Sequence, residues 1–383
     1  MVTAALSWLA LEVTGSELKL ASVAAAQYVP TLLLSLVAGG IADRISKKTI
    51  LVLTAVAGSG LAFGLAAVYI GAHLAYWQLL VASLAAGILM SFDFPARQAL
   101  LPEIVSSEQL FAGVSLTSAT QQVAWFFGPL LVGAVAAHAS MSLALLVSGT
   151  LSLAAGGVLI GLRSGRNASA PARSLVGEIR GAFVHARGDE VTPFVFAAVG
   201  VMALFIMNYQ IFITALTQRT LHLGPDGYGT LMAAMGFGAL ASAVWANLHA
   251  TDKPTLAATL AFAAITAALT LALSVAGLFF ISAMFAICGV GATWTLFQAS
   301  AQSLIQDRTP APIRGKVLSG YAILNTGVTP LGYALTGLVA QEGGVPLAFV
   351  IGGVGGLGGF AVIWVVFWAR GRRSALGREL PTR

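Results

Sequence analysis

The chain alternates between long apolar runs without charge and short polar or charged segments. Two neighbouring runs, residues 20–41 and 49–72, carry no charged side chain. Each is long enough to cross a hydrocarbon core of about 30 Å as an α-helix, which takes about 20 residues. This pattern predicts an all-α integral membrane protein.

Hydropathy predicts twelve membrane-crossing helices, of which the first is incomplete. Only a short apolar stretch precedes Glu12, whereas a span needs about 20 residues. We expect that the inner half of the first helix and a leader are missing; a misplaced start and a helix that is truly short are the alternatives. The expected spans lie near 1–14, 19–42, 49–71, 75–95, 112–137, 141–162, 192–216, 226–248, 254–275, 277–303, 316–340 and 345–369.

Composition agrees with a membrane protein, because only 9% of the residues are charged and 58% are hydrophobic. A soluble domain has about 25% charged residues. The net charge of +6 does not indicate nucleic acid, since the basic residues lie in alternate loops. If the 39–48 turn lies on the cytoplasmic side, Lys19 and Arg219 are the only basic residues expected on the outer side. This unequal distribution of basic residues predicts a cytoplasmic C-terminus. The single cysteine, Cys288, allows no internal disulfide.

The longest polar stretch divides the chain into two halves. Residues 163–190 are expected to be a cytoplasmic linker between a six-helix half at 1–162 and another at 191–370, with a cytoplasmic tail at 371–383. The sequence before Gly128-Pro129 is similar to the sequence before Pro330, which indicates an internal similarity between the two halves. Two related halves around a midplane site are a common design of secondary transporters.

The charged turn at 39–48 joins two spans and carries a recognisable motif. Its glycines allow close helix approach, and its charges can hold a neighbouring helix end. The turn resembles the Gly-x-x-x-Asp-Arg-x-x-(Arg/Lys)-(Arg/Lys) signature of the major facilitator superfamily and departs from it at Ser46. The matching residues are Gly39, Asp43, Arg44, Lys47 and Lys48.

A second charged cluster lies at the inner end of the fourth expected span. Asp93 and Arg97 share one helix face, and Pro95 is expected to break or loosen the helix there. Asp93 to Glu103, with Arg314 before the eleventh helix, resembles the superfamily branch of the enterobactin exporter and drug-efflux proteins.

That resemblance implies that Asp43, Arg44 and Asp93 form a charge relay. The relay would lock a cytoplasmic gate against the start of the eleventh helix when the site faces outward. The alternative is that these charges only anchor loops at the lipid headgroups.

Gly128, Pro129 and Gly133 resemble a shortened form of the superfamily's antiporter signature. Proline removes a backbone hydrogen bond, and glycine permits a kink or a close crossing. A purely structural kink is the alternative.

Proton coupling needs an acid within the bundle, because an intramembrane carboxylate is costly unless it is paired or functional. Glu12 is the preferred candidate, although it lies near the outer end of the first helix. The alternative is an acid at the headgroup level.

Several polar side chains fall inside the spans and are expected to face the bundle interior, since hydrocarbon offers them no partners. Asn208, Tyr209 and Gln210, with Gln298 and Asn325, form the preferred substrate surface among nearby aromatic and methionine side chains. Helix packing is an equal alternative for each. The full candidate set is Gln27, Gln121, Gln122, Asn208, Tyr209, Gln210, Trp294, Gln298 and Asn325.

These features predict a secondary transporter rather than an enzyme. Residues 353–358 match a dinucleotide fingerprint only formally, because they lie inside an apolar span, and the chain has no phosphate-binding loop. We expect a proton-coupled exporter of a siderophore or drug-like amphipathic molecule. It would be a monomer in the inner (plasma) membrane, surrounded by lipid and needing no cofactor or metal. An importer or facilitator of the same fold and a membrane scaffold are the alternatives.

Overall fold

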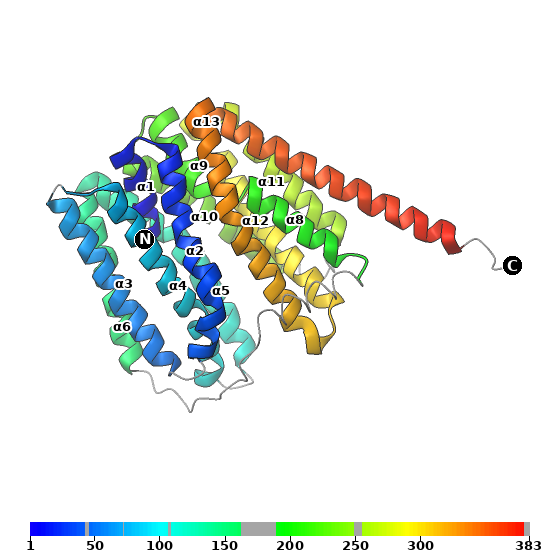
Figure 1. The fold of residues 1–383 in the computed structure, drawn as a ribbon, viewed down its shortest axis with the longest axis horizontal. Helices are drawn as coiled ribbons and strands as arrows, with labels where there is room; N and C mark the ends of the chain where they lie inside the picture. Colours follow the sequence, from blue (N-terminus) through cyan, green and yellow to red (C-terminus); the bar gives the residue numbers. More distant parts are fainter. Residues whose placement is uncertain (43–45, 72, 106–108, 162–188, 249–254, 379–383) are drawn as a thin grey trace.

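The computed structural model describes residues 1–42, 46–71, 73–105, 109–161, 189–248 and 255–378. Within these ranges the chain is helical and contains no strand (Figure 1). The helices are α1 (Val2–Thr14), α2 (Glu17–Ala42), α3 (Lys47–Ile70), α4 (Tyr76–Ile104), α5 (Leu110–His138), α6 (Met141–Gly161), α8 (Thr192–Phe205), α9 (Tyr209–Ala215), the π-helix η1 (Leu216–Thr220), α10 (Pro225–Leu248), α11 (Leu256–Ala276), α12 (Phe280–Arg308) and α13 (Ala311–Arg378).

Most expected spans agree with helices to within a few residues. Pro95 was expected to break or loosen α4, and the expected break is wrong, because the helix continues through Pro95 to Ile104. The Asp93–Arg97 segment therefore lies on a regular helix that extends beyond the apolar run. α1 has 13 residues, fewer than the roughly 20 of a full span.

The expected span 192–216 is not one helix but two. α8 ends at Phe205, and α9 begins at Tyr209 after a short non-helical stretch. The backbone N–H of Met207 donates to the carbonyl of Met202, five residues back, so the regular i to i−4 ladder is interrupted. η1 then continues α9 with π-helical hydrogen bonding.

The last two expected spans are joined in α13 and separated by a sharp kink at Gly344. This residue has φ 82° and ψ 167°, a conformation open to glycine and unfavourable for residues with a Cβ. The kink falls in the gap that the hydropathy pattern leaves between 340 and 345. Beyond it, α13 runs along α8 and α11 toward the C-terminus (Figure 1).

The glycines of this last segment pack against neighbouring helices. A Cβ on Gly352 would lie 2.8 Å from the carbonyl oxygen of Phe205, and one on Gly359 would lie 2.7 Å from the Val201 side chain. This agrees with the interpretation of the 353–358 motif as a close helix contact in lipid.

Two helix pairs make the most extensive contacts between the N-terminal group, α1 to α6, and the C-terminal group, α8 to α13. α2 packs against the first part of α13, and α5 packs against α10. The α5–α10 crossing is tight, because a Cβ on Gly133 would lie 2.7 Å from the Cα of Gly229 and would also meet the Pro225 carbonyl. In Figure 1 the two groups meet near the ends of α1 and α9 and diverge toward the opposite ends of their helices.

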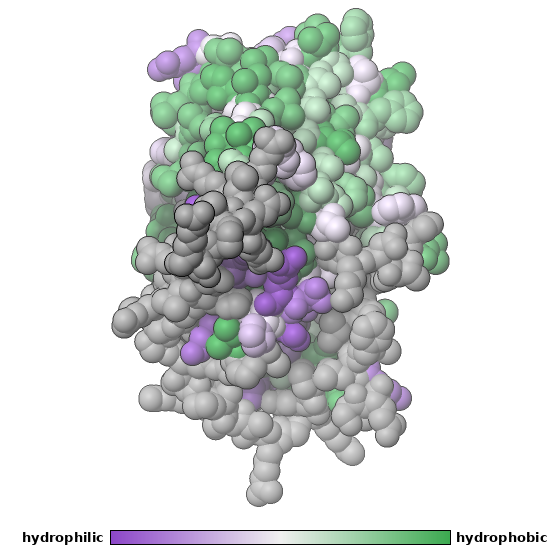
Figure 2. Space-filling model, turned by 90° about the vertical axis from the view of Figure 1, so that its right-hand side faces the viewer, coloured by the Kyte–Doolittle hydropathy of each residue, from purple (hydrophilic) through white to green (hydrophobic). Residues whose placement is uncertain are grey.

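The outer surface of the bundle is apolar. Eight helices of the described chain are long and apolar enough to cross a membrane. Large side chains such as Ile281, Phe285, Val362 and Trp364 are exposed, and Figure 2 shows hydrophobic residues covering the upper part of one face. Lipid is the environment in which such a surface is stable.

Candidate transport site and its two ends

The break between α8 and α9 is filled by Asn208, which is fully buried. Its amide Nδ2 donates to the carbonyl of Leu204 at 3.1 Å and to the Thr336 hydroxyl at 2.8 Å. Gly332 lies directly against the break, because a Cβ there would be 2.5 Å from the Ala203 carbonyl oxygen and 2.6 Å from that of Leu204. The Asn208 amide thus satisfies one carbonyl at the break, and the absence of a side chain at Gly332 lets α13 approach the break closely.

Next to Asn208, three polar side chains connect both groups of helices. The hydroxyl of Tyr333 on α13 lies 3.4 Å from that of Tyr28 on α2 and 3.3 Å from Oε1 of Gln210 on α9. The rings of Tyr28 and Tyr333 meet edge to face at 5.5 Å. We call Tyr28, Gln210 and Tyr333 the polar cluster.

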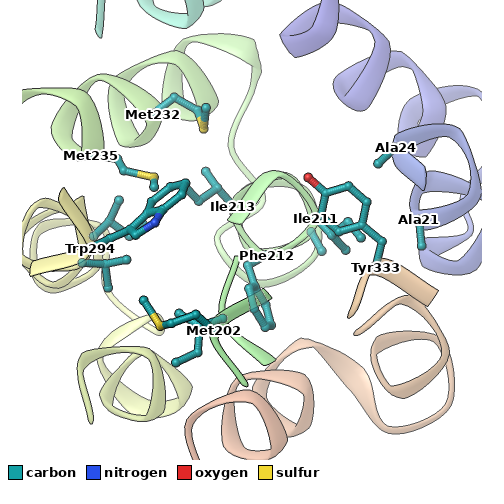
Figure 3. Packing of buried hydrophobic residues seen from close by; sticks show 14 of the residues in the cluster. Ala21, Ala24, Met202, Ile211, Phe212, Ile213, Met232, Met235, Trp294 and Tyr333 are labelled. Carbon is teal, nitrogen blue, oxygen red and sulfur yellow. The ribbon is translucent and has the colours of Figure 1, made fainter. Parts of the chain in front are cut away.

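An aromatic and sulfur-rich wall lies on the other side of α9. The rings of Tyr209 and Trp294 are 5.1 Å apart. Figure 3 shows Ile213 pointing toward Trp294 and Met235, while Ile211 lies on the side of Tyr333. α9 therefore separates the polar cluster from an adaptable apolar wall, since methionine side chains fit irregular shapes.

The other expected substrate residues lie in different surroundings. Gln298 accepts a 3.0 Å hydrogen bond from Tyr321, and Oδ1 of Asn325 is buried without a hydrogen-bond partner. Gln27 bridges helices, because its Nε2 lies 3.4 Å from the Thr3 hydroxyl on α1 and 2.9 Å from the Met90 sulfur on α4.

Two further candidates lie on α5. Gln121 is exposed on that helix. The side chain of Gln122 falls outside what the structure describes.

One end of the bundle, which we call the basic end, carries Lys47 at the start of α3, Arg97 near the end of α4 and Arg314 near the start of α13. The charged side chains described there make local contacts. Arg97 pairs with Asp93 at 2.8 Å within α4, and Thr54 on α3 donates to the same carboxylate at 3.3 Å. Arg314 donates to the carbonyl of Thr309, in the turn before its own helix, at 3.4 Å.

The motif residues of the 39–48 turn are only partly described. Asp43 and Arg44 lie outside the described residues, and only the backbone of Gly39 is placed, in α2. Lys47 is buried, and Lys48 donates to the Ile160 carbonyl on α6 at 2.7 Å. The described part of the turn thus ties α3 to α6.

The remaining expected residues lie on α1 and α5. Glu12 is exposed near the end of α1. Gly128 and Pro129 lie within α5, which continues unbroken, and Gly133 makes the close crossing with α10.

The opposite end of the bundle, which we call the far end, carries a charged contact that the sequence analysis did not predict. Arg219 Nε lies 2.8 Å from Glu17 Oε1, and Arg219 also donates to the Gly15 carbonyl. The available signal was that Arg219 is one of two basic residues on that side of the predicted topology.

Among the described residues, no group of three or more His, Cys, Asp or Glu side chains could hold a metal ion. The polar cluster consists of hydroxyl and amide groups, which can donate and accept hydrogen bonds. Such groups suit reversible binding of a small molecule.

The long apolar helices, packed in two groups with an interior polar cluster between them, are those of a secondary transporter of the major facilitator type rather than an enzyme. The chain belongs to the MFS_3 family, described as transmembrane secretion effector, whose model matches residues 1–372. It is 26% identical over 367 residues to the uncharacterized MFS-type transporter YfiS of Bacillus subtilis, covering 92% of this chain and 85% of that protein.

Solved structures of similar fold include transporters with different cargo. A POT family transporter in complex with a thioalcohol conjugated peptide has a TM-score of 0.71 at 12% identity, covering 94% of this chain and 92% of that one. The nucleoside transporter NupG has a TM-score of 0.69 at 12% identity, covering 96% of this chain and 97% of that one. The inward open xylose transporter XylE of E. coli has a TM-score of 0.68 at 14% identity, covering 94% of this chain and 91% of that one. At these identities the likeness shows the fold alone.

Proposed function

We propose that this transporter exports a small, uncharged amphipathic molecule, siderophore or drug-like, in exchange for protons. The observation that carries the proposal is the composition of the interior site. Tyr28, Gln210 and Tyr333 offer neutral hydrogen-bonding groups beside Tyr209 and Trp294. A cargo with a fixed charge needs an opposite charge nearby, because an unpaired charge in a water-poor interior is costly.

The export direction rests on the family and on the sequence motifs. The family is described as a secretion effector. The segment from Asp93 to Glu103 resembles the enterobactin-exporter and drug-efflux branch. Import or facilitated transport is the second candidate, since XylE and NupG share the fold.

The mechanism we propose is rocker-switch alternating access. The halves touch through the polar cluster and at the far end, whereas the described contacts of Asp93 and Arg314 at the basic end stay within their own halves. This arrangement supports a state that opens toward the basic end, which we assign to the cytoplasm. The motif residues at 39–48 with Asp93 and Arg97 would lock that end in the other state.

Two further residues, Glu12 and Gly133, complete the proposed mechanism. Glu12 is the proposed proton site. The Gly133 crossing between α5 and α10 serves as a close pivot between the halves. We place the protein in the inner (plasma) membrane as a monomer, with a cytoplasmic C-terminus.

Proteoliposomes test the cargo assignment. We expect uptake of a neutral aromatic amphipath and little uptake of a quaternary-ammonium analogue of equal size. In Tyr333→Phe, the loss of one hydroxyl should raise KM for the neutral compound about two- to tenfold. Tyr76→Phe on α4, which removes a hydroxyl that lies 2.6 Å from that of Ser22, is the matched control. Equal transport of both compounds, or an unchanged KM in Tyr333→Phe, would contradict the proposed site.

A further inference from the structure

The last helix ends in an arginine-rich segment that directly follows an apolar run. Residues 345–369 carry no charged side chain, and at 1.5 Å per residue they rise about 37 Å. This is longer than a hydrocarbon core of about 30 Å, so the end of the run reaches the level of the lipid headgroups. α13 remains helical to Arg378 and extends beyond the ends of its neighbours (Figure 1). The segment 370–378 contains four arginines and no acid: Arg370, Arg372, Arg373 and Arg378.

Two exposed tryptophans mark the place where the apolar run ends. Trp364 is 44% exposed and Trp368 is 53% exposed. The nearby side chains of Val362 and Val365 are exposed as well, so this face of α13 lies against lipid. Tryptophan is enriched where a membrane meets water. The two tryptophans therefore place the boundary of the hydrocarbon core just before the arginines.

Helical periodicity continues the lipid-facing side into the arginine-rich segment. Position 372 follows Trp368 by four residues and Val365 by seven, and positions at these spacings share one face of a helix. α13 packs against α8 and α11. A positive charge at position 372 thus belongs to the face that meets lipid, at headgroup depth.

Arg370 is held in place by aromatic rings. Its Cζ atom lies 5.4 Å from the centroid of the Phe194 ring on α8, and Phe194 meets Phe367 edge to face at 5.2 Å. Arg370 is exposed, and no carboxylate of the described residues forms an ion pair with it. A guanidinium that rests on a ring face keeps its N–H donors for a bidentate acceptor such as a phosphate group.

The acid that precedes α8 does not offset this charge. The carboxylate of Asp189 accepts hydrogen bonds from Val191 and Thr192. The end of α13 therefore presents an excess of positive charge at the membrane surface. Clusters of arginine and lysine directly after a membrane span attract anionic lipids.

We propose that the end of α13, residues 364–378, is a binding site for anionic phospholipid. Arg370 supplies a guanidinium that is already oriented, and the arginines at 372, 373 and 378 supply further charge. A lipid headgroup rather than free phosphate is the ligand, because the arginine positions continue an apolar face along which the acyl chains of the same lipid can lie. Binding anchors the C-terminal half of the molecule to the leaflet on that side. The proposal depends on neither the cargo nor the direction of transport.

Native mass spectrometry of the purified protein, titrated with phosphatidylglycerol or phosphatidylcholine, tests the proposal. One arginine near an anionic surface contributes about fivefold in affinity. Arg372→Gln with Arg373→Gln should therefore raise the Kd for phosphatidylglycerol about 10- to 25-fold and leave that for phosphatidylcholine unchanged. An excess of inorganic phosphate should not displace phosphatidylglycerol from the wild type.

The matched control is Lys19→Gln with Lys316→Gln, which removes two exposed positive charges elsewhere. It should keep the wild-type Kd for phosphatidylglycerol. Equal weakening in both double variants, equal affinity of the wild type for the two lipids, or displacement by inorganic phosphate would overturn the proposal.

Tryptophan fluorescence in liposomes tests where the lipid binds. Phosphatidylglycerol with brominated acyl chains, as a minor component in phosphatidylcholine, should quench the wild type more strongly than brominated phosphatidylcholine at the same fraction. In Trp364→Phe with Trp368→Phe this difference should disappear, although five of the seven tryptophans remain. A difference of unchanged size in that variant would place the bound lipid elsewhere and contradict the proposed site. Because no transport is measured, failure of the proposed transport function would appear separately.

Discussion

Asp189 lies just before α8, where its side chain replaces the missing hydrogen bonds of a helix start. It accepts from the backbone N–H of Val191 at 3.1 Å and from the N–H and hydroxyl of Thr192, both at 2.7 Å. Burial alone would raise the pKa of Asp189. The hydrogen bonds from Thr192 and Val191 and the charge of Arg308 outweigh burial, so this pKa is lower than usual.

Asp189→Ala should lower the free energy of unfolding by about 1 kcal/mol at neutral pH, because the start of α8 loses the hydrogen bonds that Asp189 accepts from Val191 and Thr192. The lowered pKa means that the carboxylate's contribution is complete above the ordinary aspartate range and is lost as pH falls through the lowered value. Thermal unfolding in detergent should therefore show a lower stability of Asp189→Ala than of the wild type at neutral pH. In strong acid the two proteins should be equally stable. Glu190→Ala, an exposed neighbour, is the control. A difference that persists in acid would contradict this account of Asp189.

The sequence predicted which interior residues are polar but not how they pair. Asn208 and Gln210 stand out because they interrupt an apolar run, and hydrocarbon offers them no partners. Their partners Thr336 and Tyr333 lie 128 and 123 residues away. Only the packing of α13 against α8 and α9 brings them together. Glu17 and Arg219, 202 residues apart, could not be paired for the same reason.

At the scale of helices, the α5–α10 crossing depends on the absence of a side chain at one position. A Cβ on Gly133 would lie 2.7 Å from Gly229 Cα, whereas the nearest atom to a Cβ on Gly128 is 3.6 Å away. Gly133→Ala should force the helices apart and lower the thermal midpoint and transport rate, while Gly128→Ala should be tolerated. Transport by reconstituted variants, compared at equal folded amount, measures this. Equal loss in both variants would show that helix flexibility, rather than the close crossing, is what matters.

Hydropathy predicted the spans well because long uncharged runs leave few alternatives in a membrane. It was wrong about Pro95, since residues after the apolar run extend α4 and proline within a helix can be tolerated when neighbours compensate. It also missed the break at 206–208. The run there is apolar on both sides, and the break depends on Asn208 and on the close approach of Gly332.

At the scale of the whole molecule, two halves meet through α2–α13 and α5–α10 and through the polar cluster. The internal similarity and the 163–190 stretch predicted two halves joined by a linker, and this division stays a prediction. The sequence could not show which end is closed, because that depends on contacts between the halves. Proton exchange as the driving force remains a prediction, resting on the family resemblance and on Glu12.

Transport by purified protein in liposomes carrying an imposed pH gradient tests the proposed exchange most directly. With a neutral aromatic amphipath as the cargo, we expect the cargo to move in the direction opposite to the flow of protons. This movement should stop when a protonophore collapses the gradient. A gradient of about 150 mV supplies about 3.5 kcal/mol per proton, enough for a cargo ratio of a few hundredfold. Cargo that only equilibrates, at the same rate with and without the gradient, would contradict the exchange and show a facilitator.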